Sequence, residues 1–79
     1  MSAEGEDKLV MMANQIAAFF AGQHVDAAAE VAGHLKWFWA PPMRARIIAH
    51  LASGAGGLSE VAAAGVARLR DETSAQAVK

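Results

Sequence analysis

The sequence contains no cysteine, which excludes disulfide bonds and thiolate ligands for zinc or for iron–sulfur clusters. Its charged fraction is only 19%, and its formal net charge is −1. A nearly neutral chain has no bulk positive field that would attract nucleic acid or an anionic membrane surface. The composition therefore predicts a protein with no thiolate-bound metal, no nucleic-acid partner and no membrane partner.

Long hydrophobic runs are also absent. The longest strongly apolar and uncharged run, residues 9–24, contains Asn14, Gln15 and Gln23. It is shorter than the roughly 20 apolar residues that cross a bilayer. Residues 1–7 are acidic, whereas a secretory signal peptide begins with a basic segment. We therefore expect a soluble, cytoplasmic protein.

The chain is short, with 79 residues, which allows one small domain. A domain of this size buries only about 60% of the surface that its unfolded chain exposes. Without a disulfide or a metal, such a core rarely contributes more than roughly 3–5 kcal/mol to stability. Much of the 54% hydrophobic fraction is alanine, which favours helix but fills a core poorly.

Apolar residues recur at helical spacing in four stretches, and no stretch shows sustained strand alternation. The predicted helices are residues 7–21, 26–38, 42–52 and 59–70, and Ser59 is the predicted N-cap of the last one. The Pro41–Pro42 pair should end the second helix and begin the third, because proline disfavours helix in the residue before it and is tolerated in a first turn. The predicted fold class is thus all-α, a small bundle of three to four short helices with a Pro–Pro junction and a Gly-rich connector.

The predicted organisation is a single helical domain with polar ends. We expect a flexible acidic lead-in over residues 1–7, a helical domain over residues 8–70 and a polar tail over residues 71–79.

One side of the first predicted helix carries no charge. Its apolar stripe consists of Leu9, Met12, Ala13, Ile16 and Phe20, and opposite this stripe lie Met11, Asn14, Gln15 and Ala18. A helix that is weakly polar all round is usually covered on more than one side. This side is therefore a candidate contact surface.

Three consecutive aromatic residues end the second predicted helix. Successive helical residues point about 100° apart, so Trp37, Phe38 and Trp39 cannot share one core face. Trp39 should point with Leu35 toward the core, Phe38 should flank that face, and Trp37 should point away. Tryptophan is enriched at binding hot spots, which favours a partner surface. The alternative is that the helix unwinds early and all three rings cover a small core.

Arg44 falls within the apolar arc of the third predicted helix, beside Met43 and Ile47. Arginine is almost never fully buried without a pair. Its stem can extend to solvent, or its guanidinium can meet a carboxylate or a helix C-terminus, on this chain or on a partner.

No catalytic or metal-binding pattern is present. The histidines at positions 24, 34 and 50 lack the i, i+4 spacing of a helical zinc site. His34 faces away from the apolar face of the second predicted helix, which favours solvent or a partner. Ser53 and Ser59 have no visible base and orienting group, so nucleophilic catalysis has no support. We predict no catalytic, cofactor-binding or metal-binding residue, and no enzyme activity of the chain by itself.

Several short motifs together carry a family resemblance. They are Met12-Ala13-Asn14-Gln15-Ile16-Ala17 with Phe19-Phe20, Val31-Ala32 with His34-Leu35, Phe38-Trp39, Pro41 before Met43-Arg44, and the stretch from Leu58 to Leu69. With them, about residues 9–70 resemble the delta subunit of NAD-dependent, molybdenum-containing formate dehydrogenases. Pro42 departs from the family pattern, in which an arginine often stands there, and the departure removes a cation from the expected contact surface.

The resemblance implies a subunit of a soluble enzyme that oxidises formate to carbon dioxide and reduces NAD. In that family the alpha subunit carries bis-molybdopterin guanine dinucleotide and most of the iron–sulfur clusters. The beta and gamma subunits carry FMN and further clusters. The delta subunit is not known to hold a cofactor and is thought to assist assembly or stability.

The main hypothesis is a non-catalytic accessory subunit that docks on the alpha subunit, with the beta and gamma subunits in the same complex. The residues expected to bind the partner are Asn14, Gln15, Phe19, Trp37, Phe38, Trp39, Pro41, Pro42, Met43 and Arg44. The alternatives are a self-associating helical module and a maturation factor that binds only during cofactor insertion.

Overall fold

The structure is a computed structural model that describes residues 2–23, 25–54 and 56–77. Met1, His24, Ala55, Val78 and Lys79 lie outside the described residues. The helices are α1 (Ser2–Ala21), α2 (Ala27–Phe38), α3 (Pro41–Ala52) and α4 (Glu60–Ala77). No strand occurs in the described ranges, and the predicted all-α class is confirmed.

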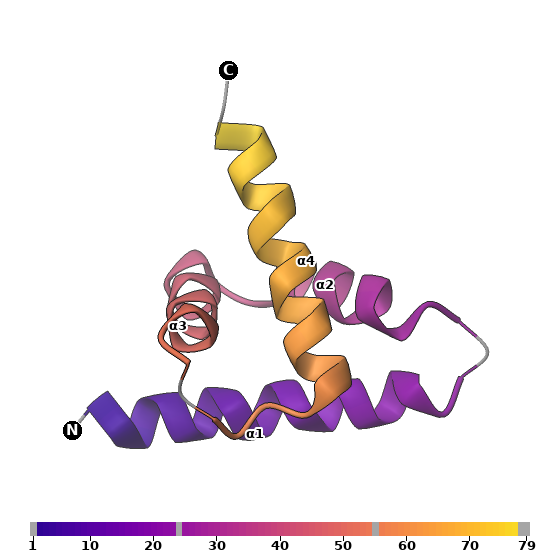
Figure 1. The fold of residues 1–79 in the computed structure, drawn as a ribbon, viewed down its shortest axis with the longest axis horizontal. Coiled ribbons are helices and arrows are strands. Elements are labelled where there is room, and N and C mark those ends of the chain that lie inside the picture. The colour runs from indigo at the N-terminus through magenta and orange to yellow at the C-terminus, as the bar shows by residue number, and fades with distance from the viewer. Residues whose placement is uncertain (1, 24, 55, 78–79) are drawn as a thin grey trace.

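The helices take several directions around α4 (Figure 1). Figure 1 shows α1 along the base of the molecule, with α2 turning back over its C-terminal half and α3 lying nearer its N-terminal half. α4 rises from the middle of α1, crosses α2, and projects beyond the other helices. α4 packs against each of the other three helices, most extensively against α2. The core therefore lies around the N-terminal part of α4.

Each helix contributes its predicted apolar face to this core. The fully buried large side chains are those of Val31, Leu35, Ile47, Val66 and Leu69. Met12, Ile16, Phe20, Met43, Ile48, Leu51, Leu58 and Val61 pack against the core from its rim. Ala13 and Ala62 are also fully buried. The helical periodicity thus located the buried side of each helix, although in α1 the buried Val10 and Ala17 lie outside the predicted stripe.

Side-chain oxygens cap the N-termini of α2 and α4. Asp26 Oδ1 accepts a hydrogen bond from the Ala29 amide, and Ser59 Oγ accepts one from the Ala62 amide, each at 3.2 Å. Both bonds satisfy backbone N–H groups that the first turn of a helix leaves without partners. The sequence predicted the Ser59 cap.

Two helix ends differ from the predictions. α1 begins at Ser2 rather than near residue 7, and α4 continues to Ala77 rather than ending near residue 70. Polarity alone does not stop a helix. The segment from Asp71 to Ala77 contains neither glycine nor proline, the residues that most strongly end one.

The connector between α3 and α4 is held by two side chains. The Asn14 amide donates to the Gly57 carbonyl and accepts from the Ser59 amide, both at 2.8 Å. His50 Nε2 lies 2.9 Å from the Gly56 carbonyl oxygen and therefore donates to it. Gly57 has a φ of 110°, which disfavours any side chain there. These bonds fix the connector against α1 and α3.

Candidate docking surface

Large apolar side chains are exposed on α1 and at the end of α2. Trp37 is 79% exposed, Phe38 75% and Phe19 63%. Trp39 is only 5% exposed and belongs to the core. Because α2 remains helical through Phe38, the three consecutive rings diverge as predicted, and early unwinding does not occur.

A row of rings crosses the seam between α1 and α2. The ring centroids of Phe19 and Phe20 are 5.1 Å apart, those of Phe20 and His34 are 6.4 Å apart, and those of His34 and Phe38 are 4.7 Å apart. The first two pairs are edge-to-face and the His34–Phe38 pair is tilted, and such contacts favour defined ring orientations. The row is therefore an ordered surface.

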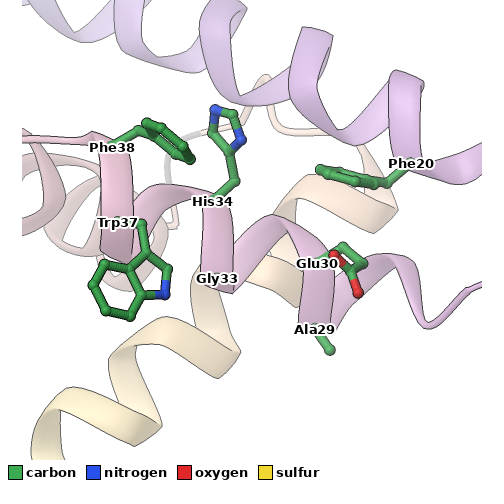
Figure 2. Close-up of a pocket in the computed structure, with 7 residues that line it drawn as sticks. All are labelled: Phe20, Ala29, Glu30, Gly33, His34, Trp37 and Phe38. Carbon is green, nitrogen blue, oxygen red and sulfur yellow. The ribbon is translucent and has the colours of Figure 1, made fainter.

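Figure 2 shows the shallow pocket that this row borders. Phe38 and His34 project toward α1, Phe20 approaches from α1, and Trp37 stands on the other side of α2. Glu30 is the one carboxylate among the lining residues. A neighbouring pocket is lined by Gln15, Ile16, Phe19, Phe20 and His34. We call Phe19, Phe20, His34, Trp37 and Phe38 the aromatic surface.

The α2–α3 corner beside this surface leaves few backbone groups without partners. Arg44 Nη1 donates to the carbonyl oxygens of Lys36 and Trp39, each at 2.8 Å. Pro41 and Pro42 occupy the first two positions of α3, where an N–H would otherwise lack a partner. A partner protein that covers this corner would therefore displace few hydrogen bonds between backbone groups and water.

The structure assigns several predicted contact residues to roles within the chain. Arg44 meets a helix C-terminus on this chain, one of the two partner types that the sequence indicated. Asn14 fastens the connector. Trp39 is buried, and Met43 is partly buried against the core.

The remaining predicted residues divide among three places. Gln15 and Phe19 line the aromatic pockets with Trp37 and Phe38. Pro42 lines a separate groove between α1 and α3, whereas Pro41 borders a groove between α3 and α4.

Two aromatic-surface residues were absent from the predicted contact set. Phe20 was assigned to the core stripe, although it is only partly buried. His34 was predicted to face solvent or a partner, and this outward direction was the sequence feature that could have marked it as a contact residue. It is half-buried between Phe20 and Phe38.

The described residues offer no grouping suited to metal chemistry. Within them, no three or more His, Cys, Asp or Glu side chains come close enough together to hold a metal ion. His50, which is 8% exposed, lies with Nδ1 3.7 Å from Glu6 Oε1. In the described part of the chain, no helix is long and apolar enough to cross a membrane.

Comparison with known proteins gives one match. No curated protein and no solved structure is significantly similar to the chain. Residues 8–66 match the family described as the NADH-dependent formate dehydrogenase delta subunit, FdsD. That match spans both the aromatic surface and most of the core. The chain therefore belongs to the family of NADH-dependent formate dehydrogenase delta subunits.

Proposed function

We propose that the chain is a non-catalytic accessory subunit of a cytoplasmic, NAD-dependent formate dehydrogenase. It docks on the molybdenum-bearing alpha subunit, in a complex with the beta and gamma subunits, and stabilises or helps to assemble that complex. The observation that carries the proposal is the exposure of Trp37 and Phe38 on a regular, capped helix.

The energetic argument concerns the area that docking would cover. Large aromatic side chains present about 150–250 Å² each. Trp37, Phe38 and Phe19 expose most of theirs. Covering all three would gain on the order of 10 kcal/mol before the costs of association, at about 25 cal/mol per Å². Burying these side chains against a partner protein would release the free energy of removing their apolar area from water.

The chemistry of the complex belongs to other subunits in this proposal. The chain has no cysteine to bind an iron–sulfur cluster. Its described His, Asp and Glu residues form no metal-binding group. The chain therefore offers no thiolate ligand to an iron–sulfur cluster. As the resemblance implies, we assign the bis-molybdopterin guanine dinucleotide, the clusters, FMN and NAD to the larger subunits.

The direct test is the binding of full-length variants to formate dehydrogenase that lacks this subunit. Trp37→Ala with Phe38→Ala should reduce retention on the alpha subunit and lower the stability of the complex. Val25→Ala is the matched control, because Val25 is 49% exposed but lies outside the aromatic surface. Unchanged retention of the double variant, with the same fold by circular dichroism, would contradict the proposal.

Two further readouts separate the alternatives. Light scattering of the isolated chain would reveal a stable dimer if the aromatic surface served self-association. The stoichiometry of the finished enzyme would fall well below one copy per alpha subunit if the chain acted only during cofactor insertion. A monomer that is stoichiometric in the finished complex supports the accessory-subunit proposal.

A further inference from the structure

A second groove lies between the N-terminal halves of α1 and α3. It is lined by Gly5, Lys8, Leu9, Met12, Pro42, Met43 and Arg46. Its floor is apolar, and its two charged residues are both cations. No Asp or Glu belongs to the lining.

The positions of the two cations follow from the packing. A Cβ atom placed on Gly5 would lie 3.0 Å from Arg46 Nη1, so the Arg46 guanidinium rests against α1 at this glycine. Gly5 and Lys8 are three residues apart and lie on the same face of α1. Arg46 and Lys8 therefore occupy the same end of the groove.

These cations differ from the arginines of α4. Arg68 pairs with Asp26, and Arg70 pairs with Asp71, both at 3.1 Å. Within the described part of the chain, Lys8 and Arg46 form no such pair, and both side chains are exposed. The two groove cations are therefore free of ion pairs with the described carboxylates.

The groove is continuous with the aromatic surface along α1. Residues 5, 8, 12, 15 and 19 follow one another at spacings of three or four, which places them on one edge of the helix. Lys8 lies toward one end of this edge, and Phe19 lies at the other. A partner that covers the aromatic surface can extend along α1 into the groove.

We propose that the α1–α3 groove binds an acidic, amphipathic segment of the large subunit. Apolar side chains of that segment would cover Leu9, Met12 and Met43, and its carboxylates would pair with Lys8 and Arg46. This inference rests on the proposed function, and it adds a second contact with the large subunit, formed by opposite charges at the α1–α3 groove. Opposite charges at the rim of an interface steer association and fix its register.

The first test reverses the charges of the groove in the full chain. Lys8→Glu with Arg46→Glu should weaken binding to the enzyme lacking this subunit by about tenfold or more at low ionic strength. The loss should shrink at high ionic strength, because salt screens exposed charges. Arg70→Glu is the control, since that side chain pairs with Asp71 and does not line the groove. Thermal unfolding of each variant verifies that it folds.

The second test identifies the chemistry of the occupant. A carbodiimide joins a lysine amine directly to a carboxylate, so Lys8 in the assembled complex should be cross-linked to an Asp or Glu of the large subunit. Lys8→Arg should abolish that cross-link without weakening binding. If Lys8 forms no cross-link to a carboxylate of the large subunit, the proposal of an acidic segment in the groove is wrong, even if charge reversal weakens binding.

The outcomes separate this inference from the proposed function. If charge reversal has no effect while Trp37→Ala with Phe38→Ala releases the subunit, the acidic contact is wrong and docking through the aromatic surface stands. If neither variant affects binding, both proposals fail. If both double variants weaken binding and Lys8 is cross-linked to the large subunit, the proposed function and the acidic contact are both supported.

Discussion

Gly65 of α4 lies against Val31 of α2 so closely that a side chain at position 65 would overlap it. A Cβ atom placed on Gly65 would fall 2.5 Å from Val31 Cγ1 and 2.6 Å from Val31 Cβ. Val31 is fully buried and cannot move aside. This contact sets the approach of the two helices that pack together most extensively.

Gly65→Ala should therefore destabilise the fold, although alanine favours helix. Overpacking a core costs about 1–3 kcal/mol, which outweighs a propensity gain of about 1 kcal/mol. Gly33→Ala in α2 is the matched control, because nothing lies within 4 Å of its added Cβ. That variant should gain up to about 1 kcal/mol. Chemical denaturation of both variants measures the difference, and changes of the same sign would contradict the close packing at Gly65.

Arg44→Ala should lower stability by about 1–3 kcal/mol, because two carbonyl groups at the end of α2 lose a charged donor. Arg46→Ala removes a neighbouring exposed arginine and should change stability by less than about 0.5 kcal/mol. Urea unfolding of the isolated chains compares the two. Equal effects of the two substitutions would rule out a special role for Arg44 at the corner.

Asn14→Ala should cost about 1–3 kcal/mol, because the substitution leaves the Gly57 carbonyl and the Ser59 amide without their partner. Gln15, the adjacent exposed residue, provides the control, because Gln15→Ala should leave the stability of the fold nearly unchanged. Hydrogen exchange should also accelerate at the Ser59 amide in the Asn14 variant. Unchanged exchange there would show that Asn14 does not hold the connector.

Acid should weaken the start of α2 through Asp26. The hydrogen bond from the Ala29 amide and that from Arg68 hold the pKa of Asp26 below its ordinary value of 3.8. A group with a lowered pKa in the folded state stabilises the fold above its unfolded pKa, and that contribution is lost as the pH falls through the folded pKa. The stability advantage of the wild type over Asp26→Asn should therefore shrink below about pH 4. Thermal unfolding across this range tests the prediction, and a constant difference would contradict it.

Much of the fold could be predicted because local rules determine it. Apolar spacing revealed which face of each helix is buried, and Pro41 located the end of α2. The outer ends of α1 and α4 were missed because polar sequence was interpreted as the end of a helix. Ser2–Asp7 and Asp71–Ala77 are polar and lack proline, and helix continues through both.

The candidate site was only partly predictable. The divergence of Trp37 from Trp39 follows from helical geometry alone, and the structure confirms it. The roles of Asn14 and Arg44 depend on contacts between separate segments. Asn14 bonds to residues 43 and 45 positions away in the sequence, and no local pattern indicates such pairs.

Photocross-linking in the assembled enzyme tests the central claim most directly. A photoreactive phenylalanine analogue at position 38 would report which protein covers the aromatic surface, and the same analogue at the exposed position 25 would serve as the control. We predict a cross-link from position 38 to the alpha subunit and a much weaker one from position 25. A cross-link from position 38 to a second copy of this chain, or to no protein at all, would contradict docking through this surface.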